Sequence, residues 1–209
     1  MKKNRTSFIP TIVCLIPLIV GIILYPKLPD VIATHWNGKG EIDGYSSKFV
    51  GIIVFPLILT LVSIFTPKLI ELDPKNKDID DKIRNIIIWI LPVICFIASS
   101  TTLLQALGKQ IRVEVIIPMI VGIVLVIIGN YLPKTKQNYT VGIKIPWTLD
   151  NEENWNKTHR LGGFTFVVGG IAIAISSFFD CRVVVMLIAT SAMVFVPIIF
   201  SYILYKKQK

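Results

Sequence analysis

Two histidines and thirteen acidic residues are the side chains of this 209-residue chain best suited to acid–base or metal chemistry. His35 is followed by Glu41 and Asp43, and such nitrogen and oxygen ligands could hold a metal ion. Their spacing matches no ordered ligand motif, and His159 has no cysteine or second histidine at ligand spacing. The sequence also lacks a nucleophile elbow and a glycine-rich phosphate loop. We therefore expect no catalytic residues, no metal, no cofactor and no enzymatic activity.

His35 lies in a long polar segment, residues 26–48, with the sequence PKLPDVIATHWNGKGEIDGYSSK. Pro26 and Pro29 would end a preceding helix. The Asn37-Gly38 and Asp43-Gly44 pairs are strong turn signals, and VIATHW before them predicts a short strand or extended segment. At roughly 23 residues the segment is long for a structureless connector, which favours an ordered loop.

His159 lies in the second polar segment, residues 133–160. Gly142 and Pro146 argue against a continuous helix there. Thr148, Asp150 or Asn151 could cap a helix that starts near residue 151 and continues into the following apolar run. On that helix Trp155 and His159 are four residues apart and share one face. A purely structural interpretation places the aromatic side chains of this segment in the interfacial belt of a membrane protein. They are Tyr139, Trp147 and Trp155.

Composition indicates that the elements carrying these segments cross a membrane. Hydrophobic residues make up 53% of the chain and charged residues 17%, whereas soluble domains carry about 25% charged residues. Six apolar runs are long enough to span a hydrocarbon core of about 30 Å, and Glu114 is the one charged residue within them. The runs are Phe8–Tyr25, Phe49–Thr66, Ile86–Leu107, Val113–Leu132, Leu161–Phe179 and Val183–Tyr205.

These runs predict an all-α polytopic membrane protein, a bundle of six transmembrane helices with two ordered polar loops. Continuous rather than alternating apolar runs favour helices over a β-barrel. We expect one membrane domain, residues 1–209. It would contain an amino-terminal module at about 8–66 with the loop 26–48, and a carboxy-terminal module at about 113–205 with the loop 133–160. Gly162, Gly163, Gly169 and Gly170 would allow close helix packing.

Lys and Arg are distributed unevenly between the loops. With six spans both chain ends share a side, and that side holds sixteen Lys and Arg residues against six on the other. Because loops rich in these residues stay in the cytoplasm, we expect both termini and residues 133–160 inside, and residues 26–48 outside. The net charge of +9 is then mostly a result of topology, suits contact with the lipid bilayer and calls for no direct nucleic-acid partner.

The polar residues inside the spans leave several functions open. Coupled carriers usually keep ionisable groups in mid-membrane, whereas here the polarity is limited to groups such as Ser63, the run Ser99–Thr102 and Gln105. A proton pump is not expected, but a small transporter or flippase for a peptide or lipid stays open. A protein with ordered loops on both faces could also report an outer ligand to an inner partner through small helix shifts.

Both polar segments resemble those of the Sdp immunity protein (SdpI) family of Gram-positive bacteria, and the resemblance covers essentially the whole chain. In LPDVIATHWNGKGEIDGYSSK the matching positions are Pro29, Ile32, His35, Trp36, Asn37, Gly40, Asp43 and Lys48. In NYTVGIKIPWTLDNEENWNKTHRLGG they are Asn138, Gly142, Pro146, Trp147, Thr148, Trp155, His159, Arg160 and Gly162. Lys144 stands where an arginine is common, which keeps the positive charge but not the guanidinium fork.

The resemblance implies a bacterial plasma-membrane protein that protects the producing cell from a secreted, SdpC-like peptide toxin. It also implies capture of an SdpR-like cytoplasmic repressor at the membrane. Some relatives are orphan immunity or envelope-stress proteins. The candidate toxin-binding residues are His35, Trp36, Asn37 and Asp43. The candidate cytoplasmic partner surface comprises Asn138, Gly142, Lys144, Pro146, Trp147, Thr148, Trp155, His159 and Arg160.

Overall fold

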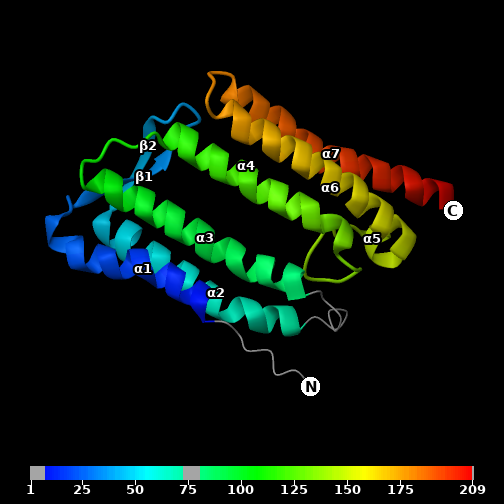
Figure 1. Ribbon diagram of the computed structural model, residues 1–209, viewed down its shortest axis with the longest axis horizontal. Coiled ribbons are helices and arrows are strands. Elements are labelled where there is room, and N and C mark those ends of the chain that lie inside the picture. Colours follow the sequence, from blue (N-terminus) through cyan, green and yellow to red (C-terminus); the bar gives the residue numbers. More distant parts are fainter. Residues whose placement is uncertain (1–7, 73–80, 209) are drawn as a thin grey trace. The chain divides into compact units, whose positions relative to one another are not determined.

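The computed structural model describes residues 8–72 and 81–208 of the chain (Figure 1). Its packing separates two compact units. Of the described residues, the amino-terminal unit comprises 8–69 and 85–113, and the carboxy-terminal unit comprises 70–72, 81–84 and 114–208. Each unit is described by itself below.

Among the described residues, six helices are long and apolar enough to cross a membrane, which confirms the predicted all-α, multi-pass membrane protein. The long helices are α1 (Ile9–Leu24), α2 (Phe55–Glu71), α3 (Asp81–Ala106), α4 (Val113–Tyr131), α6 (Glu152–Ser176) and α7 (Arg182–Gln208). Short turns extend or connect them: η1 (Tyr25–Lys27), the π-helical η2 (Val50–Val54), η3 (Leu132–Lys134) and the five-residue α5 (Pro146–Asp150). A small two-stranded sheet, β1 (Val31–Trp36) and β2 (Ile42–Ser47), completes the fold.

The start of α6 follows the predicted capping chemistry. The Asn151 side chain accepts a hydrogen bond from the backbone N–H of Asn154 at 2.8 Å, and Glu152 and Glu153 occupy the first turn, where acids favour the positive end of the helix dipole. The predicted helix from about residue 151 into the fifth span is therefore confirmed. Asp81 likewise lies in the first turn of α3, where a negative charge is favourable.

In the amino-terminal unit, the sheet and the helix ends share one apolar cluster. Leu28, Ile32 from β1, Ile52 from η2 and Leu103 from α3 are buried together. Farther along, Cys14 of α1 and Cys95 of α3 are fully buried, and the Cys95 thiol lies 4.0 Å from the Cys14 carbonyl oxygen. Both cysteines therefore pack as small, buried side chains.

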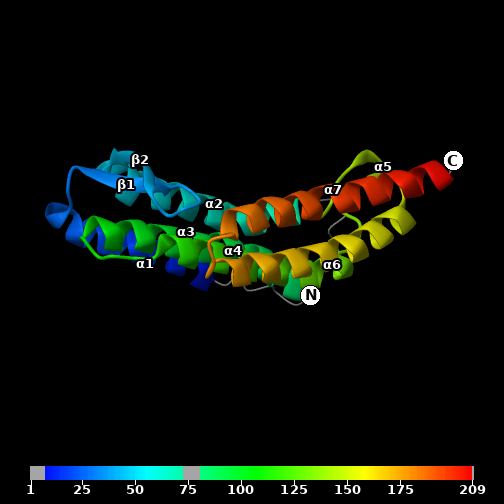
Figure 2. The same ribbon diagram turned by 90° about the horizontal axis from the view of Figure 1, so that it is seen from above.

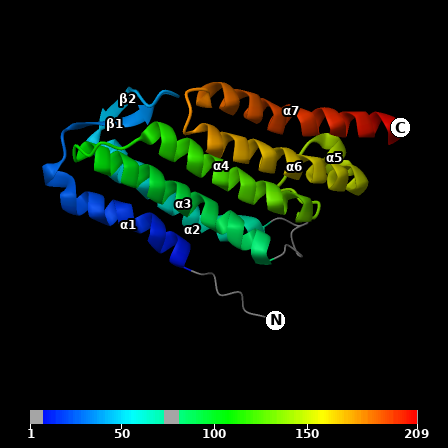
Figure 3. The ribbon, with the colours of Figure 1, turned by 45° about the horizontal axis from the view of Figure 1, so that its top comes forward.

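In the carboxy-terminal unit, α6 and α7 form a helical hairpin and run side by side (Figures 1, 2 and 3). On another face of α6, glycines bring α4 and α6 into backbone contact. A Cβ at Gly170 would lie 2.6 Å from the Gly122 carbonyl oxygen, and one at Gly163 would lie 2.7 Å from the Gly129 carbonyl oxygen. Close approach through small residues is how helices gain packing energy without a hydrophobic drive in lipid.

We expect Gly170→Ala to destabilise the protein by about 1–3 kcal/mol, because the new methyl group meets backbone that cannot rotate away. Gly169→Ala is the matched control on the same helix. Its Cβ would meet the flexible Met193 side chain at 3.1 Å, and alanine gains up to about 1 kcal/mol of helix propensity. The midpoint of thermal unfolding in detergent measures both. An unchanged midpoint in Gly170→Ala would contradict the described α4–α6 contact.

Candidate functional site

The segment around His35 folds as a β-hairpin. The predicted strand VIATHW is confirmed as β1, and it pairs antiparallel with β2. The second strand was not predicted, because the Asp43-Gly44 pair was interpreted as a turn and in fact lies inside β2. The strand pairing is irregular at His35 and brings its side chain against residue 44. This explains why residue 44 is glycine, because a Cβ there would lie 2.7 Å from the His35 Cβ.

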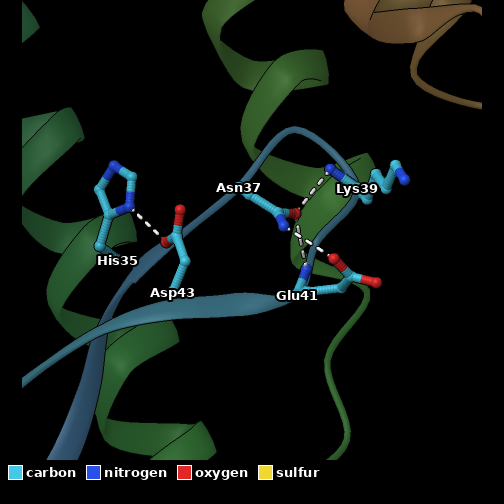
Figure 4. Close-up of polar contacts among 5 residues, drawn as sticks. All are labelled: His35, Asn37, Lys39, Glu41 and Asp43. Atoms are coloured by element: carbon cyan, nitrogen blue, oxygen red, sulfur yellow. Dashed lines mark hydrogen bonds and ion pairs between the residues drawn. The ribbon is translucent and has the colours of Figure 1, made fainter.

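Asn37 organises the turn between the strands (Figure 4). Its side-chain oxygen accepts hydrogen bonds from the backbone N–H groups of Lys39 at 2.9 Å and Glu41 at 3.1 Å. Its amide donates to a Glu41 carboxylate oxygen at 2.8 Å. Gly40 adopts a φ of 84°, which glycine tolerates best. Asn37 therefore fixes the turn.

His35 and Asp43 form a cross-strand pair on the exposed side of the hairpin, with the His35 Nδ1 and an Asp43 carboxylate oxygen 2.5 Å apart (Figure 4). Glu41, the third ligand considered for a metal ion, is instead hydrogen-bonded to Asn37. Within residues 8–72 and 81–208, no group of three or more His, Cys, Asp and Glu side chains could hold a metal ion. The pair presents one polar, hydrogen-bonded contact surface.

Lys48 holds the base of the hairpin. Its backbone N–H donates to the Asp30 carbonyl oxygen, and its ammonium lies 2.9 Å from the Asp30 carboxylate and 3.3 Å from the Leu28 carbonyl oxygen. The ammonium also lies 4.9 Å from the centre of the Tyr25 ring, a favourable cation–π geometry. The half-buried Trp36 sits at the other end of β1, beside the turn.

The second candidate site is the cap segment, residues 135–160 of the carboxy-terminal unit. Its first turn is built by the buried Asn138, whose side-chain oxygen accepts from the N–H groups of Thr140 at 2.8 Å and Val141 at 2.7 Å. The same side chain donates to the Lys136 carbonyl oxygen at 2.7 Å. The exposed Lys144 then donates to the carbonyl oxygens of Tyr139 and Thr140, both at 3.1 Å. Asn138 thus serves as an internal scaffold.

Thr148 fixes the entry to α5. Its hydroxyl lies 2.8 Å from the Ile143 carbonyl oxygen and 2.9 Å from the Ile145 carbonyl oxygen, which share its single proton. The hydroxyl oxygen accepts from the Ile145 N–H at 3.1 Å. At the other end of α5, the Gln137 amide donates to the carbonyl oxygens of Thr148 and Leu149. Thr148 is fully buried and uses its hydrogen bonds internally.

Trp155 and His159 form the centre of the cap segment. Both side chains are fully buried, and their rings stack with centroids 3.9 Å apart. The Trp155 indole N–H donates to the Thr135 carbonyl oxygen at 2.7 Å. The prediction that the two residues share one helix face is confirmed. The interpretation of Trp155 as an interfacial belt residue is wrong, because the loop before α6 folds over its ring.

The hydrogen bonds of His159 define its tautomer. Nδ1 lies 2.8 Å from the Trp155 carbonyl oxygen and must donate, whereas Nε2 accepts from the backbone N–H of Ile143 at 3.0 Å. This arrangement requires a neutral imidazole. Gly142, at φ 126°, lies directly over both rings, and a Cβ there would collide with His159 Nε2 and approach the Trp155 ring at 2.9 Å. His159 therefore bridges α6 and the preceding loop.

Trp147 connects α5 to α7. Its ring lies 5.5 Å from Tyr202 and stacks against Tyr205 at 5.8 Å between centroids. Lys206 lies 5.3 Å from the centre of the Tyr202 ring. Aromatic pairs at these separations add stabilisation beyond the area they bury. Trp147 is half-buried, so one edge of this aromatic cluster borders the surface.

The sequence analysis missed a buried polar contact between α6 and α7. The Asn154 side-chain oxygen accepts from the hydroxyls of Thr158 at 3.0 Å and Ser201 at 2.5 Å, and its amide donates to the Ser201 carbonyl oxygen at 3.0 Å. All three side chains are fully buried. The four-residue spacing of Asn154 and Thr158 was an available signal, but Ser201 lies 47 residues away in the chain.

The polar run in α3 is packed into the amino-terminal unit. Ser99, Thr101 and Thr102 are buried, and the Ser99 hydroxyl lies 4.0 Å from the Cys95 thiol. Small hydroxyl groups of this kind stabilise helix contacts in lipid. Their burial gives the run a packing role.

The predicted cap residues thus fall into three groups by exposure. Asn138, Thr148, Trp155 and His159 are buried and shape the segment, whereas Lys144, Pro146 and Arg160 are exposed, and Gly142 and Trp147 are intermediate. In the hairpin, His35 and Asp43 are exposed and Trp36 and Asn37 are half-buried.

These features define a class: a multi-pass α-helical membrane protein with an ordered β-hairpin in one unit and an ordered cap segment in the other. Residues 134–201 match the SdpI/YfhL protein family, and residues 12–60 match a Domain of unknown function (DUF1648). The chain is 33% identical over 210 aligned positions to a protein of Bacillus subtilis (strain 168) named Immunity protein SdpI, covering 99% of this chain and 98% of that relative. The chain therefore belongs to the SdpI/YfhL family. No solved structure matches it.

We expect Gly142→Ala to destabilise the protein by more than about 2 kcal/mol, through both backbone strain and collision with the Trp155–His159 stack. Gly108→Ala is the matched control, since Gly108 also has a positive φ of 76° but open space around its Cβ position. Strain alone should cost that variant about 1 kcal/mol. Thermal unfolding midpoints of the two variants give the comparison. Equal midpoints would contradict the close packing over the stack.

Proposed function

We propose that this protein protects the cell that makes it from a secreted, SdpC-like peptide toxin. The observation that carries the proposal is the extent of the match to the relative named Immunity protein SdpI. That match covers 99% of this chain, so it includes the hairpin and the cap segment as well as the spans. A likeness confined to apolar helices would carry far less information about function.

The hairpin is the proposed toxin-facing surface. The distribution of Lys and Arg favours an extracytoplasmic position for residues 26–48. His35 and Asp43 are exposed there and would contact the toxin directly. Trp36 and Asn37 would act mainly by holding the strand end and the turn, because Asn37 forms five hydrogen bonds within the turn.

The cap segment is the proposed cytoplasmic surface, where an SdpR-like repressor would be captured. Lys144, Pro146 and Arg160 are its exposed candidates for contact, with the half-buried Trp147 beside them. Two cationic groups favour an acidic patch on the partner. The buried residues Asn138, Thr148, Trp155 and His159 would support capture indirectly by maintaining the shape of the segment.

Expression of this protein in toxin-sensitive bacteria should allow growth at a concentration of the mature peptide toxin that kills cells carrying an empty vector. The reason is that an immunity protein acts on its own, in the membrane that the toxin attacks. Survival counts measure the effect, and immunoblots of the membrane fraction verify insertion. Equal killing of both strains, with the protein present in the membrane, would refute the immunity function.

Arg160→Glu should abolish capture of a co-expressed SdpR-like repressor while protection against the toxin is kept, because a reversed charge repels an acidic patch. Lys157→Ala is the matched control, an exposed basic residue on the same helix that is ion-paired with Glu153 at 2.6 Å. Fluorescence of a tagged repressor at the membrane measures capture. Undiminished capture by Arg160→Glu would remove this residue from the partner surface.

The same cells provide a control for orientation. Cys181, in the turn between α6 and α7, is exposed, whereas Cys14 and Cys95 are buried. A membrane-impermeant maleimide should therefore label intact cells at Cys181, and Cys181→Ser should abolish the labelling. Labelling that requires cell lysis would place the cap segment outside and contradict the cytoplasmic assignment.

A further inference from the structure

The hairpin has one face directed toward the helices and one directed away from them. Ile32 and Thr34 point toward η2, since a Cβ at Gly51 would meet both side chains within 3.0 Å. Side chains alternate along a strand, so the residues between them belong to the opposite face. On that outer face, in the regularly paired part of the sheet, lie Val31, Ala33, Tyr45 and Ser47.

This outer face exposes an aliphatic and an aromatic side chain. Val31 is 61% exposed and Tyr45 is 65% exposed, while Ala33, opposite Tyr45 in the register, is buried. Aromatic side chains that are exposed in an ordered strand are effective binding anchors, because they offer a large contact area for little conformational entropy.

The adjoining backbone edge is also accessible. The described sheet has only two strands, so β2 has a strand partner on one side alone. None of the β2 residues is buried, in contrast to β1. Register irregularities are confined to residues near His35, whereas Tyr45, Ser46 and Ser47 pair regularly with β1. A regular strand edge presents backbone donors and acceptors that suit an extended peptide.

The charge of the outer face indicates what kind of peptide would bind there. The residues of the outer face, Val31, Ala33, Tyr45 and Ser47, carry no acidic or basic side chain, and Lys48 at the strand end is paired with Asp30. The face is thus close to neutral and carries apolar side chains. It complements an uncharged, apolar segment better than a basic or acidic one.

We propose that β2 receives an extended apolar segment of the peptide toxin as a third strand, with Tyr45 and Val31 as residues that determine specificity. The inference rests on the proposed function and adds to it a mode of recognition and two contact residues. Backbone hydrogen bonds to Tyr45–Ser47 would supply affinity, and the side chains at alternate toxin positions would meet Tyr45 and Val31.

Binding of the mature peptide toxin to the purified, full-length protein in lipid nanodiscs tests the proposal. Tyr45→Ala should weaken binding about tenfold and reduce survival, as expected for an aromatic anchor, whereas Tyr45→Phe should bind like the wild type. Phe178→Ala is the matched control and should have no effect. Phe178 lies in the turn between α6 and α7, and its side chain is 60% exposed, similar to that of Tyr45.

A set of toxin peptides, each N-methylated at one backbone position, tests strand addition itself. Methylation should weaken binding roughly threefold to tenfold at alternate positions of one segment, because only every second N–H faces the neighbouring strand. The positions between them should tolerate the methyl group.

The outcomes separate this inference from the proposed function. If the wild type gives no protection, the function itself fails. If the wild type protects and binds, but Tyr45→Ala does so equally or N-methylation shows no alternation, the strand-addition proposal alone is overturned. Disulfide cross-linking of Tyr45→Cys between two copies without toxin would show that the edge is occupied by a second copy, which also overturns it.

Discussion

The stacked pair of Trp155 and His159 is the interaction on which the cap segment depends. A buried indole N–H without an acceptor costs about 1–3 kcal/mol, and here the Thr135 carbonyl oxygen satisfies it. The imidazole connects two chain segments, since one ring nitrogen serves the Trp155 carbonyl and the other receives the Ile143 N–H. The loop can approach this closely because residue 142 has no Cβ. Removing any of these parts leaves a buried polar group without its partner.

The hairpin is ordered by a different means. Its contact with the apolar core is made mainly by Ile32. Its geometry is fixed by polar interactions at its two ends. Asn37 closes the turn, and Lys48 with Asp30 closes the base. Between these two ends, Val31 and Tyr45 of the outer face remain exposed. This explains how a short two-stranded sheet, marginal by itself in water, can hold an exposed aromatic surface in a defined register.

The sequence was sufficient for features that depend on local chemistry. The spans follow from the length of uncharged runs, the start of α6 from the Asn151 cap, and β1 from its β-branched and aromatic residues. It was insufficient where distant segments meet. Gly44 looked like a turn residue until His35 was seen beside it, and Ser201 gave no sign of its contact with Asn154. Trp155 resembled a belt residue because nothing local shows that Gly142 folds over it.

In the cap segment, burial also separates the residues that maintain its shape from those that are accessible to a partner. Trp155, His159 and Thr148 are fully buried, and their hydrogen-bonding groups are used within the protein. They have no donor or acceptor left to offer another molecule. In the proposed function, contacts at the cap segment would therefore come from exposed neighbours such as Lys144 and Arg160, which lie outside the stack. The buried side chains maintain the shape of the cap segment, and the exposed side chains would determine which partner binds. The same buried centre could therefore support surfaces that bind different partners.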